Sequence, residues 1–354
     1  MELDAFILTH YLPRYFKNKE ESFVDKNGKT IFFSIKEFAK SICEKNNCFI
    51  CGTSAKTSEF NEEHIFPTWL LKQFKIHNHK FVSSGQSEKI YGNLTLRCCE
   101  SCNSLMGELF ENKLSEIFKS KSPISELKKV ENAKLLLNWL ALIFIKSHLN
   151  DKFQKIYDDK GNYIKLSKDR DWIQLHHIHC LSRIFYSGCN ISPEVFGRLI
   201  VMPALNAKDI EPFDYCDSFD GSCLMIRIND LVIFYVFNDC GASFNCLKEG
   251  LFDKISGTLD PLQIREIFSR ILATNLALKN RPQFSTLIKC ANYCEIVVER
   301  DSAPFFEPIP DDHFGYYFDF YSSQYKLSKE NRQLVKKGKC TFILDKKGKF
   351  IQST

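Results

Sequence analysis

Two Cys-x-x-Cys pairs, far apart in the chain, constrain the fold of this sequence more than any other feature. The first is Cys48-Phe-Ile-Cys51 and the second is Cys99-Glu-Ser-Cys102. Four thiolates with this spacing form the tetrahedral ligand set that a structural zinc ion prefers. We therefore expect one Zn²⁺ to join the two segments and to stabilise a small unit that has little hydrophobic core of its own.

The second pair has a neighbour that could replace one of its members, because Cys98 directly precedes Cys99. The CxxC spacing selects Cys99 together with Cys102, so Cys98 is predicted to be a packing residue. Most of the other cysteines stand alone in the sequence. The chain is long and its N-terminus lacks the basic start of a secretion signal, so we expect reduced, buried thiols and a cytoplasmic protein.

Polar residues between and after the cysteine pairs have the chemistry that phosphodiester hydrolysis needs. His64, in the run Asn61-Glu-Glu-His-Ile-Phe-Pro67, titrates near neutral pH and can act as a general base. Glu63 is a hard oxygen ligand suited to Mg²⁺, and Asn103 offers a second oxygen at the expected start of a helix. Asn93 can accept a hydrogen bond from the imidazole and orient it.

The order CxxC, Glu-His-Ile-x-Pro, Asn-Leu and CxxC-Asn resembles the zinc-containing branch of the HNH (ββα-metal) endonucleases, over roughly residues 46–118. This resemblance implies a β-hairpin and a helix that hold one catalytic Mg²⁺ or Mn²⁺, with the zinc knuckles outside. It implies His64 as the general base, Glu63 and Asn103 as metal ligands and Asn93 as the residue that orients His64. Glu111, on the same helix, is either a third ligand or a surface or structural acid.

The resemblance implies DNA as the substrate and products with a 5′-phosphate and a 3′-hydroxyl; the sequence does not distinguish DNA from RNA. One site makes one nick, so double-strand cutting requires a homodimer or two successive events. Several HNH proteins of similar length serve in anti-phage defence, and by analogy we expect such a role here, with a regulatory protein partner.

The alternative is a protein of another class, a zinc-ribbon nucleic-acid-binding or adaptor protein without catalysis. The cysteine pairs are compatible with both classes. A binding ribbon has no need of Glu63, His64 and Asn103 at these positions, so the sequence favours the nuclease. No apolar run reaches the roughly 18 residues that span a bilayer, and we expect no membrane partner.

The fold class that we predict is α+β, a small zinc-stapled ββα-metal (HNH) module joined to a larger mixed α/β domain. The predicted domains are residues 1–45 (hairpin and helix), 46–118 (nuclease module) and 119–354 (a domain for DNA recognition, sensing or partner docking). Turn and cap residues predict hairpins over 22–35, 224–237 and 341–351, and helices over 34–45, 103–118, 124–150 and 260–278.

Three further clusters have plain interpretations. In Leu175-His-His-Ile-His-Cys180 a strand would place His177 and His179 on one face, and ordinary structural histidines are favoured over a metal site. His77 and His79 are expected in a solvated loop. The net charge is +5, and nine Lys or Arg gather between residues 326 and 349, where a phosphate contact and a solvated surface are equally compatible with the sequence.

Overall fold

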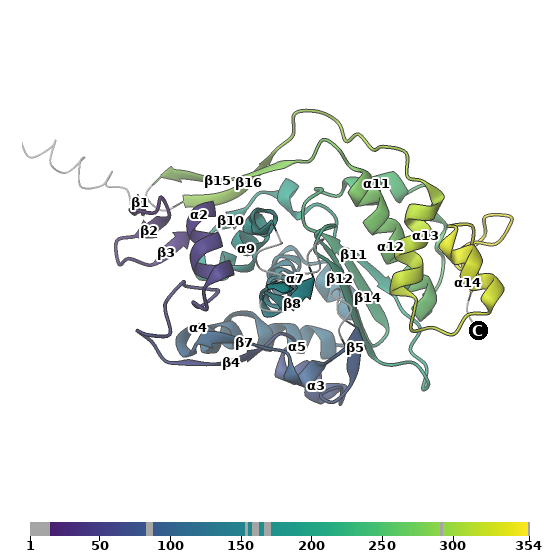
Figure 1. The fold of residues 1–354 in the computed structure, drawn as a ribbon, viewed down its shortest axis with the longest axis horizontal. Coiled ribbons are helices and arrows are strands. Elements are labelled where there is room, and N and C mark those ends of the chain that lie inside the picture. Colours follow the sequence, from purple (N-terminus) through teal and green to yellow (C-terminus); the bar gives the residue numbers. More distant parts are fainter. Residues whose placement is uncertain are drawn as a thin grey trace, which may run out of the picture. The chain divides into compact units, whose positions relative to one another are not determined.

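The computed structural model describes residues 15–82, 88–152, 155–157, 163–165, 171–290 and 293–352. The chain forms two compact units. The N-terminal unit comprises residues 1–195 and 284–298, and the C-terminal unit comprises residues 196–283 and 299–354. Helices and small sheets alternate in both units, so the predicted α+β class is confirmed (Figure 1).

The N-terminal unit contains three groups of elements along the chain. The first is β1 (Tyr15–Lys17), β2 (Phe23–Asp25), β3 (Thr30–Phe32), α2 (Ile35–Glu37) and the π-helical segment η1 (Phe38–Glu44). The second is β4 (Phe60–His64), α3 (Thr68–Gln73), β5 (Lys80–Val82), β6 (Glu88–Ile90), the 3-10 turn η2 (Tyr91–Asn93), β7 (Thr95–Cys99), α4 (Glu100–Met106), the π-helical segment η3 (Gly107–Glu111) and α5 (Asn112–Lys119). The third is α6 (Pro123–Leu127), α7 (Val130–Asp151), β8 (Lys155–Tyr157), β9 (Tyr163–Lys165), η4 (Trp172–Leu175), α9 (His176–Ser182), α10 (Ile184–Ser187), β10 (Asn190–Ile191), β15 (Gln283–Cys290) and β16 (Tyr293–Glu299).

The predicted hairpin over residues 22–35 is confirmed, and its turn chemistry explains it. Asp25 Oδ1 accepts hydrogen bonds from the backbone N–H groups of Asn27 and Lys29, and Gly28 supplies the left-handed residue, with φ of +80°. Ser34 then caps the next helical segment by accepting from the N–H of Glu37. The predicted short helix is therefore confirmed as α2 followed by η1.

Helix α7 is the centre of the N-terminal unit. Between Leu135 and Leu149 its residues are buried except for a half-buried Ser147, so this part of the helix is enclosed on all sides. The predicted helix over 124–150 is also divided into α6 and α7. Helix α9 and strand β7 both contact α7, and Figure 1 shows α7 between α9 and α5.

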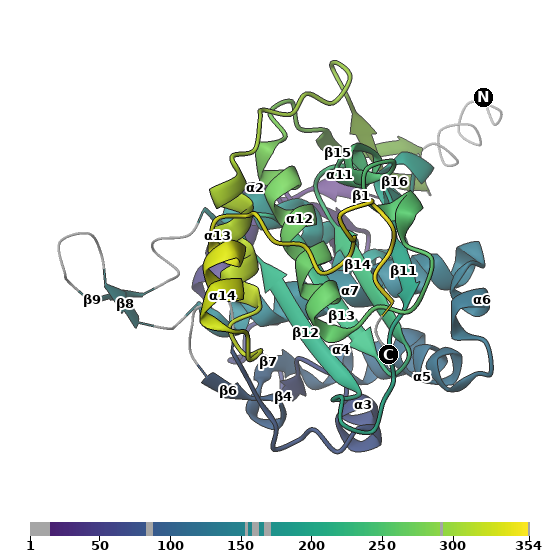
Figure 2. The same cartoon turned by 90° about the vertical axis from the view of Figure 1, so that its right-hand side faces the viewer.

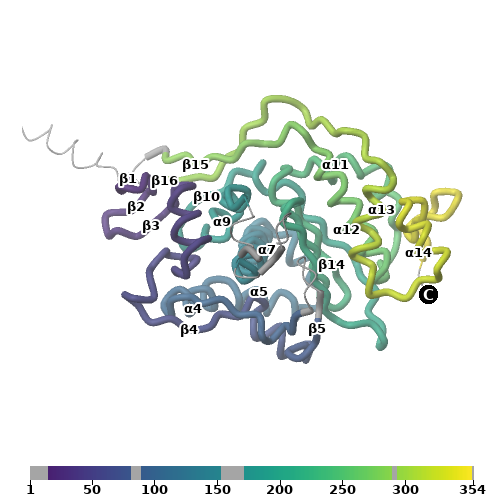
Figure 3. The backbone as a smooth tube through the Cα atoms, viewed as in Figure 1, coloured from purple at the N-terminus to yellow at the C-terminus, as the bar shows by residue number. Residues whose placement is uncertain are grey.

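The predicted domain boundary between residues 118 and 119 lies inside this unit, because α7 follows that boundary and packs against β7, η3 and α5. The unit is also discontinuous in sequence. Strand β16, which comes after most of the C-terminal unit in the chain, pairs in parallel with β10, and the two lie side by side in Figure 3.

The C-terminal unit is built on a four-stranded antiparallel sheet in the order β11-β14-β13-β12. Its elements are β11 (Ile200–Pro203), β12 (Phe213–Ser218), β13 (Cys223–Ile228), β14 (Leu231–Val236), α11 (Ala242–Leu247), η6 (Phe252–Lys254), α12 (Pro261–Ala277), α13 (Asp311–Tyr321) and α14 (Lys329–Lys336). Figure 2 shows α12 lying across the sheet, where the two share one hydrophobic core.

Local signals in the C-terminal unit agree well with its structure. The predicted hairpin around Asn229-Asp230 is confirmed as β13 and β14, and Asn229 takes the left-handed conformation, with φ of +53°. Asp260 and Gln263 form a reciprocal capping box at the start of α12. The third predicted hairpin is reduced to one antiparallel bridge between Leu344 and Phe350. Within the described residues, no helix combines the length and apolar character of a bilayer span.

Candidate functional site

Strands β4 and β7 form an antiparallel pair, and α4 follows β7 directly along the chain. Glu63 lies opposite Leu96 and His64 opposite Thr95, and the backbone bond from Ile65 N–H to the Leu94 carbonyl extends the pairing by one step. Helix α4 contacts both strands. The segment between the two strands contains α3 and the small β5–β6 hairpin. Apart from this segment, the paired strands β4 and β7 are followed by α4, which gives the order strand, strand and helix.

The four predicted zinc ligands come together beside this strand pair. The sulfur atoms of Cys48, Cys51, Cys99 and Cys102 all lie within 4.8 Å of one another, so this cluster can bind a metal ion. The Sγ atoms of Cys51 and Cys99 are 3.6 Å apart. A tetrahedral zinc with Zn–S bonds of roughly 2.3 Å has sulfur–sulfur edges of about 3.8 Å, which is close to this separation.

Cys98 lies next to the cluster. It is buried, and its Sγ is 3.6 Å from that of Cys48. The set of four that shares one centre contains Cys99, as the CxxC spacing predicts, and Cys98 packs against it. The cysteines that the structure describes are free thiols, and most are buried as predicted, whereas Cys246 is exposed.

Helix α9 and its C-cap residue Arg183 hold the backbone of the first cysteine knuckle by hydrogen bonds. His179 Nε2 donates to the Phe49 carbonyl at 2.7 Å, and the fully buried Arg183 donates to the carbonyls of Ile50 and, at 3.1 Å, of Ile31. Phe49 and Ile50 are the two residues between Cys48 and Cys51. These contacts satisfy backbone carbonyls that would otherwise be buried without a donor.

The strand that we considered for the His176–Cys180 run is wrong, since these residues form α9. Helical spacing places His176 and His179 on the side of Phe38, whose ring contacts both imidazoles, whereas His177 stacks on Phe284 with ring centroids 3.6 Å apart. Within the described residues, the four-cysteine cluster is the one group of three or more potential metal ligands, and these histidines are structural.

Glu63 and Asn103 lie on the same side of the strand pair. Asn103 Nδ2 donates to Asn61 Oδ1 at 2.7 Å, which fixes α4 against β4. Asn61 and Glu63 are two residues apart on β4, so their side chains point to the same face, about 7 Å apart along the strand. Within the described residues, no other hydrogen bond engages the Asn103 side chain.

The helix that carries Asn103 begins earlier than its sequence indicates. Its first residue is Glu100, and Cys99 occupies the N-cap position. We predicted the start at Asn103, and this is wrong because the second cysteine of the knuckle, Cys102, already lies within the helix. Asn103 is therefore a first-turn residue rather than a cap.

Glu63 makes a buried ion pair with Lys146 of α7. Lys146 Nζ lies 2.8 Å from Glu63 Oε1, and the side chains are 3% and 12% exposed. The same ammonium donates to the backbone carbonyl of His64 at 2.7 Å. Sequence reasoning missed Lys146, although a lysine inside the apolar run Leu135–Leu149 was a signal, because a buried lysine needs a partner.

His64 is half-buried at the end of β4. Its ring centroid lies 6.0 Å from that of His77, which is exposed as predicted. Burial lowers the pKa of His64, and the neighbouring Glu63 carboxylate opposes this effect. The imidazole is therefore neutral at physiological pH, the form in which it can accept a proton.

Asn93 ends the 3-10 turn η2 and is exposed. The residue before it, Gly92, places its backbone beside His64, where a hydrogen bond raises the pKa of the imidazole. A hydrogen bond from the His64 imidazole to the Asn93 side chain stays a prediction.

Glu111 is brought toward this site by the π-helical segment η3. In a regular α-helix, Glu111 would be roughly 80° around the axis from Asn103. One extra residue in a π turn reduces this offset to about 20°, so both side chains leave the same face of the helix. Burial, together with the Glu63 carboxylate, raises the pKa of Glu111 to about 7, and Lys146 opposes the shift.

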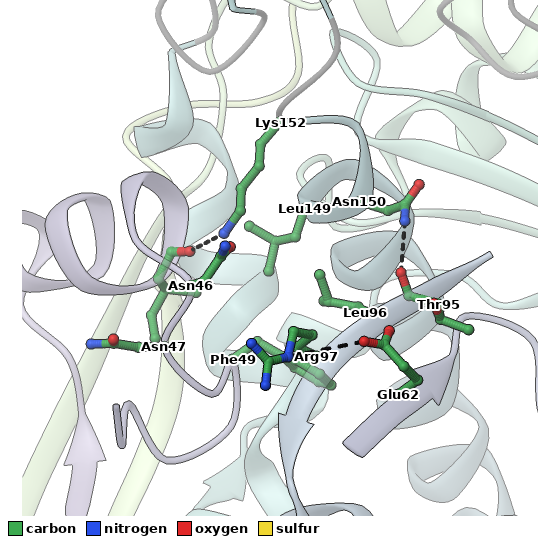
Figure 4. Close-up of a pocket in the computed structure, with 11 residues that line it drawn as sticks. Asn46, Asn47, Phe49, Glu62, Thr95, Leu96, Arg97, Leu149, Asn150 and Lys152 are labelled. Carbon is green, nitrogen blue, oxygen red and sulfur yellow. Dashed lines mark hydrogen bonds and ion pairs between the residues drawn. The ribbon is translucent and has the colours of Figure 1, made fainter. Parts of the chain in front are cut away.

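A small pocket of about 160 Å³, lined by polar and apolar residues, adjoins the strand pair (Figure 4). Asn150 Nδ2 donates to the Thr95 carbonyl at 2.7 Å, which ties α7 to β7. Lys152 Nζ donates to the carbonyls of Ile42 and Lys45 at 3.0 and 2.7 Å. This buried lysine, the C-cap residue of α7, therefore holds the end of η1.

Comparison of the chain with known protein families, curated proteins and solved structures finds no match.

We expect Cys99→Ser to remove most of the bound metal and Cys98→Ser to retain it, because Cys99 shares the four-sulfur centre. The measurement is the zinc content of each purified full-length variant by plasma mass spectrometry. The reverse result, with zinc lost from Cys98→Ser alone, would assign the fourth ligand to Cys98.

We expect Arg183→Met to lower the free energy of unfolding by about 3 kcal/mol or more, since several buried carbonyls lose their donor. Urea denaturation measures this change. Lys119→Met, an exposed site on α5, is the control and is expected to change it by less than ~0.5 kcal/mol. Equal effects of the two substitutions would contradict the supporting role of Arg183.

We expect Glu111→Gln to become increasingly stabilising, relative to wild type, between pH 5 and pH 8. An unfolded glutamate titrates at about 4.3, so across this window the folded wild type holds a proton that the unfolded chain lacks, and its stability falls as the pH rises. Thermal melts of both proteins are expected to diverge by roughly 2–4 °C. Exposed Glu116→Gln is the control, and a pH-independent difference for Glu111→Gln would disprove the expectation.

Proposed function

We propose that this protein is a metal-dependent nuclease that hydrolyses DNA phosphodiester bonds. The observation that carries the proposal is the β4–β7–α4 unit, in which Glu63 and the first-turn residue Asn103 face the same side and His64 follows Glu63 directly. The sequence order of these residues and the order of the elements agree with the ββα-metal arrangement that the sequence resembles.

The donor set fits a hard divalent cation. Glu63 uses Oε1 for Lys146, and within the described residues no hydrogen bond engages its Oε2. Asn103 uses its amide nitrogen for Asn61, which leaves its carbonyl oxygen for a cation. One carboxylate and one carboxamide suffice for Mg²⁺ or Mn²⁺, which retain several waters. Such a cation, when bound, neutralises charge on the phosphate and on the leaving oxygen.

The chain's own residues supply the proton transfer. The neutral His64 imidazole accepts a proton from the attacking water, whose oxygen forms a bond to phosphorus. The bond from phosphorus to the 3′ oxygen breaks, and that oxygen takes a proton from solvent. The products carry a 5′-phosphate and a 3′-hydroxyl. The cysteine cluster, with zinc as the proposed metal, holds the start of α4 against the strands.

The test is cleavage of supercoiled plasmid by the full-length protein with Mg²⁺ or Mn²⁺. We expect His64→Ala to lower the cleavage rate by about 10²–10⁴-fold, the usual contribution of a general base. His313→Ala, which removes an exposed histidine of α13, is the matched control and is expected to cleave like wild type. RNA of the same sequence serves as the second substrate.

Two outcomes would reject catalysis. If wild type leaves both substrates intact with either cation, or if His64→Ala cleaves as fast as wild type, the remaining account is the non-catalytic zinc-ribbon protein. Binding of the same plasmid by both proteins would then identify a nucleic-acid-binding function.

A further inference from the structure

Lys146 lies on α7, outside the 46–118 segment, yet its ammonium group ends at strand β4. Only 3% of its side chain is exposed. It donates to Glu63 Oε1 at 2.8 Å and to the His64 carbonyl at 2.7 Å. A buried ammonium is unfavourable unless it is paired and hydrogen-bonded, and these two contacts provide both conditions.

The two contacts act on consecutive residues in different ways. The bond to Glu63 holds a side chain, whereas the bond to His64 holds the main chain from which the imidazole projects. One rigid helix therefore sets the position of both groups relative to each other. Because the Lys146 ammonium binds Oε1 of Glu63, the second carboxylate oxygen, Oε2, is the one left to bind another ligand.

A second acid adds to this arrangement. Glu111 interacts electrostatically with both Glu63 and Lys146. Lys146 therefore lies between the two acids of this cluster and makes its direct contact with Glu63.

We infer that Lys146 is a positioning residue for the catalytic cation, which makes α7 part of the metal site. This inference rests on the proposed function, because Glu63 is taken as a ligand of that cation. Lys146 does not touch the substrate or the reacting atoms; it acts by aiming Glu63 and by fixing the main chain at His64.

The test compares Lys146→Met with Lys152→Met in the full-length chain saturated with zinc. The two lysines form a matched pair, since Lys146 lies on α7, Lys152 is the C-cap residue of the same helix, and both are buried and donate to backbone carbonyls. Lys152 donates to carbonyls at the end of η1, those of Ile42 and Lys45, whereas Lys146 donates to Glu63 and His64; Figure 4 shows Lys152 at its pocket. If the removal of any buried lysine weakens Mn²⁺ binding, both variants are affected. If the positioning of Glu63 and His64 matters, Mn²⁺ binding is weakened in Lys146→Met alone.

The readout is Mn²⁺ binding, followed by electron paramagnetic resonance of the free ion, with the Mn²⁺ dependence of plasmid cleavage measured in parallel. We expect Lys146→Met to weaken Mn²⁺ binding by about 10–100-fold, the usual effect of removing a group that orients a ligand, and Lys152→Met to stay within ~3-fold of wild type. Lys146→Arg, which keeps the charge and the donors, is expected to recover most of the loss.

Lys146→Gln is the second variant in case Lys146→Met does not fold; it keeps a donor and removes the charge, and the same direction is expected. If a folded Lys146→Met or Lys146→Gln binds Mn²⁺ like wild type, the inference is overturned while plasmid cleavage by wild type still supports the proposed function. If wild type binds Mn²⁺ and Lys146→Met does not, but neither cleaves, the positioning role stands and the proposed function fails. Absence of Mn²⁺ binding by wild type overturns both.

Discussion

The convergence of four cysteine sulfurs is the constraint on which the rest of the N-terminal unit depends. Cys99 ends β7 and Cys102 lies in the first turn of α4, so the cluster fixes the angle at which strand passes into helix. Cys48 and Cys51 belong to a turn in which Gly52 has φ of +80°, and a Cβ there would come within 2.8 Å of the Phe33 ring. The first knuckle therefore has no room for a side chain at position 52, and Arg183, the C-cap residue of α9, holds its backbone.

The same constraint explains how polar chemistry is placed in a small volume. Once β7 passes into α4 at a fixed angle, Asn103 reaches Asn61, and the face of β4 that carries Glu63 turns toward the helices. The π turn in η3 then brings Glu111 onto the face of Asn103. Each polar group is positioned by a backbone feature, and Lys146 connects these groups to the most buried helix of the unit.

Sequence reasoning succeeded where the determinants are local. The Asp25–Gly28 turn, the left-handed Asn229 and the capping box of Asp260 each involve residues within four positions of one another, so their side-chain chemistry is visible in the sequence. The cysteine set was predictable because CxxC spacing reflects the geometry of one metal. The order of Glu63, His64 and Asn103 could likewise be read, but the amide of Asn61 that meets Asn103 could not be paired without the fold.

The structure differs from the sequence-based predictions where long-range packing decides the fold. The His176–Cys180 run alternates in a way that suits a strand. As a helix it presents His179 to the Phe49 carbonyl of the first knuckle and His176 to the Phe33 carbonyl, both more than a hundred positions earlier. Lys146 stands in an apolar run of the sequence, and only the fold places Glu63 beside it. The division of the chain after Val195 depends on β16 returning to β10, a pairing that no local pattern predicts.

The pairing of β16 with β10 affects when the N-terminal unit can complete its fold during translation. The N-terminal unit includes residues 284–298, and Phe284 stacks on His177. A ribosome adds about 5–20 residues per second, so some 10–35 seconds separate the synthesis of Lys119 from that of Val298. During this interval the segment that carries Glu63 and His64 has emerged while its unit still lacks two strands. Completion of the fold therefore comes late in translation, and a hydrolytic site built on it would mature only when most of the polypeptide exists.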